Sequence, residues 1–221
     1  MGYFSNVSAL KKDILQETIA TLYMTSFSAL IAGFIGLILG IVLVVTQRQA
    51  LLENRLLYTV TDKLINLLRA IPFIILMALI APVTRWIVGT RIGNKAAIVP
   101  LVFSAAPFFA KQVEQALSSL DYGLIEAAIS MGDGPMDIIF SVYLKEGFNN
   151  LVRASAITLI SLLGLTTMAG AIGAGGIGKL AIAVGYNTYK DDIVLVSVVI
   201  ILILVYSIQG LANLLIKKNT H

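Results

Sequence analysis

The chain has 221 residues, of which 58% are hydrophobic and only 13% are charged, and its formal net charge is +4. So apolar a composition excludes an ordinary water-soluble domain and indicates an integral membrane protein. The absence of cysteine excludes disulfide bonds, thiol nucleophiles and cysteine metal sites. Basic residues in a membrane protein mostly record topology and contact with lipid headgroups, so the positive charge does not indicate nucleic-acid binding.

Residues 3–17 form an amphipathic N-terminal segment without the short apolar core and cleavage site of a removed signal peptide. Long stretches without charged residues follow it. Because a membrane-spanning helix needs about 20 mostly apolar residues, these stretches predict five spans in a single transmembrane domain, residues 1–221. The predicted spans are residues 18–46, 64–81, 96–116, 150–171 and 192–216.

The second and third predicted spans contain the shortest uncharged stretches. Their helical hydrogen bonding is interrupted by Pro72, Pro82, Pro100 and Pro107. A re-entrant or protein-buried helix is therefore the alternative for each of these two spans. Arg69 adjoins the second span, where a charged side chain either faces a wet pathway or gate, or extends to the lipid headgroups.

Residues 119–147, between the third and fourth spans, form an insertion that is too polar for hydrocarbon and too apolar for a solvated linker. Residues 124–131 suit one short helix, the Gly-Asp-Gly sequence at 132–134 breaks it, and Pro135 is well placed to begin a second helix. Charge specifies the orientation only weakly. If the insertion is cytoplasmic, five spans place the N-terminus outside and the basic C-terminus inside, in agreement with the positive-inside rule.

In the second helix of the insertion, apolar residues at helical spacing form one continuous stripe. They are Met136, Ile139, Phe140, Tyr143 and Leu144. Such a stripe fits the groove of a partner protein, or it packs against the chain's own membrane domain. The pattern alone leaves both interpretations open.

A glycine-rich segment, residues 168–178, follows the fourth span and precedes Lys179. It fits two nucleotide-binding glycine motifs, but no strand is expected before it, and Leu180 stands where a phosphate-binding loop needs Ser or Thr. Nucleotide binding is therefore not expected. The small residues instead predict close backbone contacts or a moving loop. Met168 is a candidate gate residue, with ordinary packing as the alternative.

One spacing within the insertion is characteristic of a known family. The residues concerned are Glu126, Ala127, Ala128, Gly132, Val142 and Leu144. This pattern resembles the EAA loop of importer-type ABC transporter permeases, in which the loop is a coupling helix that docks in a cleft of a separate ATPase subunit. That family usually has proline after the final leucine. Lys145 stands there in this chain, which leaves the second helix free to continue.

The similarity extends over nearly the whole chain, and within the importers the chain looks like a methionine permease. The residues that carry this likeness lie at 69–76, 81–90, 98–100, 105–108 and 168–178. The resemblance implies an all-α integral membrane protein with the type I ABC importer permease fold, in which a cytoplasmic coupling helix joins spans three and four. A permease for another small amino acid is the alternative.

The resemblance also implies a function and partners. The chain would form the pathway for methionine, with Arg69 and Met168 as pathway or gate residues, and an extracytoplasmic binding protein would deliver the cargo. Two ATPase subunits would carry ATP and Mg, so this chain would be no enzyme and would hold no cofactor. Because five spans make a thin wall, a homodimer in the lipid bilayer is expected. The expected ATPase-coupling residues are Glu126, Ala127, Ala128, Gly132, Ile139, Phe140, Tyr143 and Leu144.

Two rival functions belong to other classes. An ion-coupled secondary transporter would normally place ionisable residues deep within its spans, which the uncharged stretches argue against. An integral membrane enzyme would need titratable residues clustered at one membrane surface. The insertion offers carboxylates there, but no His or Cys accompanies them.

Overall fold

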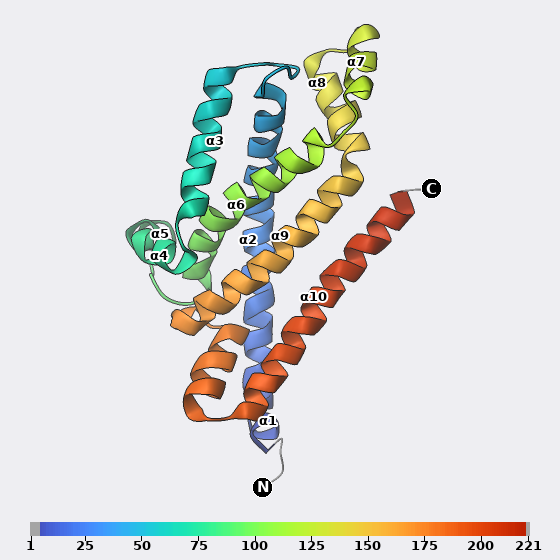
Figure 1. The fold of residues 1–221 in the computed structure, drawn as a ribbon. Helices are drawn as coiled ribbons and strands as arrows, with labels where there is room; N and C mark the ends of the chain where they lie inside the picture. The colour runs from blue at the N-terminus through green and yellow to red at the C-terminus, as the bar shows by residue number, and fades with distance from the viewer. Residues whose placement is uncertain (1–4, 220–221) are drawn as a thin grey trace.

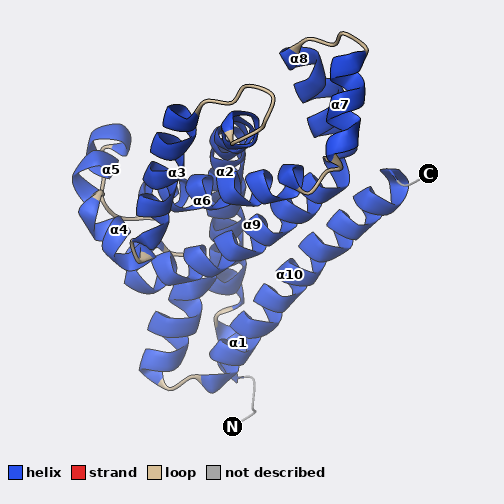
Figure 2. Cartoon of the chain, turned by 45° about the horizontal axis from the view of Figure 1, so that its top comes forward, coloured by secondary structure: helices blue, strands red, loops and turns tan. Residues whose placement is uncertain are grey.

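The computed structural model describes residues 5–219, and every regular element within this range is a helix (Figures 1 and 2). The α-helices are α1 (Ser5–Ala9), α2 (Lys11–Thr46), α3 (Arg55–Ala70), α4 (Phe73–Leu79), α5 (Ala81–Val88), α6 (Asn94–Ser118), α7 (Tyr122–Ser130), α8 (Pro135–Ile138), α9 (Phe148–Ala169) and α10 (Asp191–Asn219). The wider π-helical segments are η1 (Ile139–Leu144), η2 (Gly170–Ala174) and η3 (Lys179–Gly185), and η4 (Tyr186–Thr188) is a 3-10 turn. The predicted all-α fold is confirmed.

Four helices of the described residues are long and apolar enough to cross a membrane. They are α2, α6, α10 and the segment Phe148–Ala174, which joins α9 to η2 and is kinked at Ile172 and Gly173. These helices contain the first, third, fourth and fifth predicted spans. The third span is unbroken although Pro100 and Pro107 lie inside α6, so its two prolines do not end the helix.

The second predicted span, residues 64–81, is not a single helix. α3 ends at Ala70, Ile71 has an extended backbone with φ −80° and ψ 121°, and α4 begins at Phe73. The cause is Pro72, which has no N–H to donate and disfavours a helical conformation at the residue before it. The boundaries expected for this span are therefore corrected to one helix, a break at Ile71 and Pro72, and a second helix.

α2 and α6 cross in close contact at two glycines of α2 (Figure 1). A Cβ on Gly36 would lie 2.7 Å from the carbonyl oxygen of Ala106, and a Cβ on Gly40 would lie 2.5 Å from Cβ of Val113. Both distances are shorter than any ordinary contact, so only glycine permits this approach. Small residues at helix interfaces allow such close packing inside a membrane, where apolar burial adds little.

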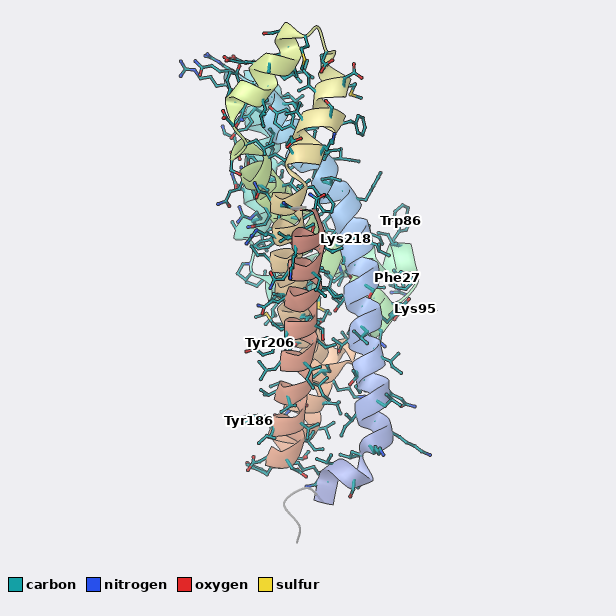
Figure 3. The ribbon with its side chains drawn as sticks, turned by 90° about the vertical axis from the view of Figure 1, so that its right-hand side faces the viewer. Phe27, Trp86, Lys95, Tyr186, Tyr206 and Lys218 are labelled. Carbon is teal, nitrogen blue, oxygen red and sulfur yellow. The ribbon has the colours of Figure 1, made fainter. Side chains whose placement is uncertain are left out.

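The two ends of the molecule carry different features (Figure 1). α1 lies at one end with the segment η2 to η4, whereas α7 and α8 lie at the opposite end, beyond the C-terminal end of α2. α10 runs along the outside between these ends (Figure 3). At its C-terminal end, Nδ2 of Asn219 donates to Oδ1 of Asn149 at 3.2 Å. Only 11% of the spanning window of α10 is buried, so most of its surface is left for lipid or for another chain.

The close approach of α2 and α6 predicts different effects of two glycine-to-alanine changes in one helix. Gly40→Ala should destabilise the chain by about 1–3 kcal/mol, because the added methyl group overpacks the contact with Val113. The matched variant Gly33→Ala has no atom within 4 Å of its new Cβ and should leave stability unchanged or raised. The measurement is the thermal midpoint of each variant purified in detergent. Equal midpoints would contradict the packing account.

Candidate functional site

The insertion folds into two short helices joined by a glycine turn. The carboxylate of Asp121 accepts a hydrogen bond from Gly123 N at 2.9 Å and caps α7. Gly132 has φ +91°, a left-handed conformation that favours glycine, and Pro135 opens α8 at its first position. The two helices and the turn predicted from the sequence are confirmed.

The predicted apolar stripe is divided between two faces. α8 continues directly into η1, and Ile139 and Tyr143 are buried there with 9% and 3% exposure. Met136 and Phe140 are 67% and 65% exposed, and Leu144 is partly buried. The stripe therefore has two faces. One face packs on the chain itself, and the other is left without a partner among the described residues.

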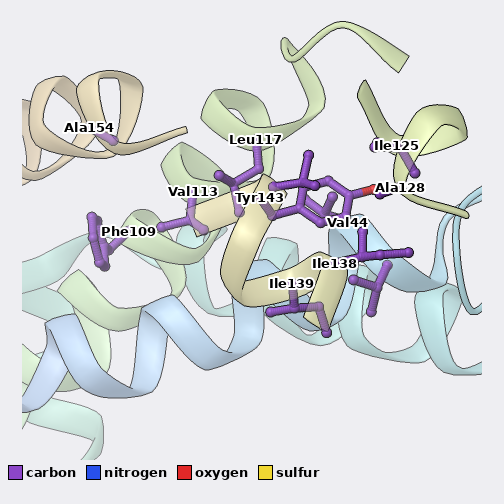
Figure 4. Close-up of a cluster of buried hydrophobic side chains, with 12 residues drawn as sticks. Val44, Phe109, Val113, Leu117, Ile125, Ala128, Ile138, Ile139, Tyr143 and Ala154 are labelled. Carbon is purple, nitrogen blue, oxygen red and sulfur yellow. The ribbon is translucent and has the colours of Figure 1, made fainter. Parts of the chain in front are cut away.

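The buried face of α8 and η1 belongs to the largest hydrophobic cluster (Figure 4). Ile138 and Tyr143 pack there with Val44 of α2 and with Val113 and Leu117 of α6. Burial raises the pKa of the Tyr143 phenol above its ordinary value, with a smaller contribution from Tyr122, so the phenol stays neutral. The helix that follows the turn is thus fixed to the membrane helices by one side.

Of the three residues Glu126, Ala127 and Ala128, one is buried and two are exposed. Ala128 is 1% exposed and packs in the same cluster, whereas Glu126 and Ala127 are exposed. Across residues 5–219, the carboxylate of Glu126 has no hydrogen bond or ion pair. An uncompensated carboxylate and a small residue thus stand at the outer surface of α7.

Lys145, which replaces the usual proline, has helical backbone angles, φ −77° and ψ −53°. The helical conformation continues through Glu146, and the chain turns at Gly147 into α9. A Cβ on Gly147 would lie 2.3 Å from the carbonyl oxygen of Tyr143 and 2.5 Å from Cδ2 of Leu117. Glycine at this position therefore permits the close turn that ends the insertion.

Two cavities lie along α3, α6 and α9, and Arg69 lines both. The first has a volume of about 360 Å³ and is polar on several sides. It is lined by Asn66, Arg69, Ser104, Phe108, Thr158 and Ser161, among others. The second, of about 390 Å³, extends from Arg69 to Lys111 and Glu114. The structure thus places one of the two predicted pathway residues in a cavity, whereas Met168 lines neither of these two and is 49% exposed.

A charged network that the sequence analysis did not foresee joins α3 to α6. Nζ of Lys111 donates to Oε2 of Glu114 at 2.6 Å and to a carboxylate oxygen of Asp62. Tyr58 donates to the second oxygen of Glu114 at 3.0 Å, and Asn66 Nδ2 donates to Asp62 at 3.0 Å. The single positive charge of Lys111 is therefore shared by two carboxylates, those of Asp62 and Glu114. The signal available in the sequence was weak: a spacing of three residues between Lys111 and Glu114.

The glycine-rich segment is held by contacts with α2. Gly176 N donates to Oε2 of Glu17 at 2.5 Å, and Nζ of Lys179 lies 2.6 Å from the other oxygen of Glu17. Ile177 N donates to Oγ1 of Thr21 at 2.8 Å. Lys179 therefore pairs with a carboxylate, and the expected close backbone contacts are present. Glu17 could not be identified from sequence, because 159 residues separate it from Gly176.

A chain whose long apolar helices surround polar cavities, with a folded insertion at one end, has the architecture of the membrane component of a transporter. The family described as "Binding-protein-dependent transport system inner membrane component" matches residues 32–221. The chain belongs to this family and is a multi-pass membrane protein.

Similar proteins and structures cover almost the full chain. The probable D-methionine transport system permease protein MetI of Vibrio cholerae serotype O1 is 41% identical over 96% of this chain and 95% of the relative. The methionine import system permease protein MetP of Bacillus subtilis is 42% identical over 96% of this chain and 95% of the relative. A chain in the solved inward-facing MetNI methionine ABC transporter is 41% identical, with a TM-score of 0.94, over 96% of this chain and 99% of that one.

A more distant structure shares the fold alone. It is a chain of an amino acid ABC transporter solved with histidines, which is 18% identical over 99% of both chains, with a TM-score of 0.80. The type I ABC importer permease fold implied by the resemblance is confirmed by the likeness to the MetNI transporter.

The contacts of Glu17 predict that its charge orders the glycine-rich segment. Glu17→Gln removes the ion pair with Lys179 and weakens the hydrogen bond from Gly176 N. Because a hydrogen bond to a charged group contributes about 1.5–3 kcal/mol, amide hydrogen exchange of a peptide covering residues 173–180 should accelerate by about tenfold or more. Asp13→Asn, an exposed change on the same helix, is the control. Equal exchange in both variants would contradict the prediction.

Proposed function

We propose that this chain is the membrane permease subunit of an ATP-driven importer of methionine. The observation that carries the proposal is the two-sided helix of the insertion, which is anchored to the membrane helices by Tyr143 and presents Phe140 outward. The choice of cargo is supported by the printed names of relatives that match more than nine-tenths of this chain. A permease for another small amino acid is the nearest alternative.

The predicted coupling residues would have different roles in the proposed ATPase contact, according to whether they are exposed or buried. Glu126, Ala127 and Phe140 are exposed and would contact the ATPase subunit. Ile139 and Tyr143 are buried and would transmit its movement to α2 and α6, because a close-packed cluster moves as one body. Ala128 would belong to the buried set, Leu144 would pack beside it, and Gly132 would supply the turn between the two helices.

Two copies of the chain would enclose the pathway on a twofold axis, with two ATPase subunits on the side of the insertions. ATP and Mg would be bound by those subunits, and this chain would do no chemistry. Their closure would draw the two insertions together and open the pathway toward the extracytoplasmic binding protein. An amphipathic helix in a groove is a recurrent form of recognition, and Met136 and Phe140 supply the apolar face that it needs.

The two-sided helix predicts that assembly and folding are separable. Phe140→Ala should reduce capture of the ATPase subunits by about tenfold or more, as for an aromatic residue at the centre of an interface, and should reduce ATP-dependent methionine uptake with it. Tyr143→Ala should instead lower the thermal stability of the permease itself, because it empties a buried position. The measurements are co-purification from membranes, labelled methionine uptake and the thermal midpoint.

Trp86→Ala is the control for Phe140→Ala, since Trp86 is an 86% exposed aromatic residue of α5, remote from the insertion (Figure 3). It should leave capture and uptake unchanged. If Phe140→Ala captures the ATPase normally, the insertion is only a packing element. Uptake that persists without ATP and follows an ion gradient would favour a secondary transporter.

The proposed orientation places the N-terminus outside and the C-terminus in the cytoplasm. The chain has no cysteine, so a single introduced thiol reports its own side of the membrane without background. Lys12→Cys should react with a membrane-impermeant maleimide in intact cells or spheroplasts, whereas Lys218→Cys should react only after the membrane is opened. Both side chains are exposed. The reverse pattern would overturn the orientation, and with it the cytoplasmic placement of the insertion.

A further inference from the structure

Arg69 holds an unusual position among the basic residues near the membrane helices. It lies in the last turn of α3 and lines both cavities, and its guanidinium carbon lies 5.8 Å from the centroid of the Phe108 ring. This distance allows a cation–π contact, which restricts the guanidinium to the cavity wall. Arg69 is exposed within the chain, so its charge is not buried in the protein interior.

The two carboxylates of the charged network between α3 and α6 are already bound by other groups. Glu114 accepts from Lys111 at 2.6 Å and from Tyr58 at 3.0 Å, and Asp62 accepts from Lys111 and Asn66. Within residues 5–219, Arg69 itself has neither an ion pair nor a hydrogen bond from its side chain. Its planar donors are therefore free for an anion that enters the cavity.

The first cavity suits a small amino acid in size and in chemistry. Its volume of about 360 Å³ falls in the range of about 300–1,000 Å³ that is usual for small-molecule sites. Leu162 and Leu165 offer apolar contacts for a side chain. The amide of Asn66 donates to Asp62, which leaves its oxygen to accept from an ammonium group, and the hydroxyl of Ser161 is also available.

We propose that Arg69 binds the carboxylate of the cargo at a transient site in this cavity. A guanidinium presents parallel N–H donors that match both oxygens of a carboxylate, which lysine cannot reproduce. The cavity is partly open at the surface of the chain, so an amino acid could enter and leave it, as a transport pathway requires. This inference rests on the proposed function, because it assigns a role within methionine import.

The test uses the permease in complex with its ATPase and binding protein, reconstituted in liposomes. Arg69→Gln should lower ATP-dependent uptake of labelled methionine by about 10- to 100-fold, since bonds to charged groups are among the strong ones. ATP hydrolysis stimulated by the binding protein should stay within about twofold. Arg69→Lys should keep part of the uptake. Arg85→Gln, which removes the same charge from the last turn of α5, is the matched control and should be normal.

A second measurement reports binding directly. A methionine analogue with a photoreactive diazirine is irradiated with the wild-type complex in the absence of binding protein, and labelled peptides are identified by mass spectrometry. Label should appear on peptides of α3, α6 or α9 that line the cavity. Methionine should compete with the label, whereas methioninamide, which lacks the carboxylate, should not. Arg69→Gln should remove this label.

The outcomes distinguish a failure of the proposed function from a failure of the carboxylate site at Arg69. Wild-type uptake that is absent or independent of ATP overturns the proposed function. With wild-type import intact, normal uptake in Arg69→Gln overturns the carboxylate site and leaves Arg69 with a lipid phosphate as its partner. Label outside the cavity, or equal competition by methioninamide, also overturns it. If Arg69→Gln fails to assemble, the labelling and competition of the wild-type complex decide alone.

Discussion

The burial of one face of α8 and η1 against α2 and α6 is the contact on which the rest of the structure depends. Ile138 is 0% and Tyr143 is 3% exposed, and full burial of such a side chain contributes about 1.5–3 kcal/mol. Without this contact the insertion would be a loose loop, and movement of its outer face would not reach the membrane helices. With it, a displacement at Phe140 would be carried to Val44 and Val113 under the proposed coupling. The same two helices, α2 and α6, make their close contact at Gly40.

Local features of the insertion could be predicted from the sequence because short-range rules determine them. Gly132 has a positive φ, which glycine favours, and Pro135 begins a helix where its missing N–H costs nothing. The long spans were equally accessible, because hydrocarbon thickness sets their length. The break at Pro72 does not follow from the proline rule alone. The same proline rule that breaks the chain there leaves α6 continuous at Pro100, where packing against α2 maintains the helix.

The remaining features depend on contacts that sequence periodicity does not contain. Helical spacing identifies an apolar stripe but cannot tell which of its residues are buried. Tyr143 is buried and Phe140 is exposed because of where α2 and α6 lie. Glu17 holds the backbone of Gly176 from a distant part of the chain, and no spacing rule connects them. Arg69 could be singled out as a charge beside a span. Its free donors become evident only after Lys111 is seen to bind the nearby carboxylates.

The charges around the two cavities also constrain what can enter. Asp62 and Glu114 carry two negative charges, and Lys111 and Arg69 carry two positive ones, so the group is balanced as a whole. A simple anion bound at Arg69 would unbalance it, whereas a zwitterionic amino acid adds both signs at once. In the weakly screened environment between membrane helices, an unbalanced charge is costly. Electrostatic balance therefore favours an amino acid over an inorganic anion, and it does so independently of the apolar contacts that accommodate the side chain.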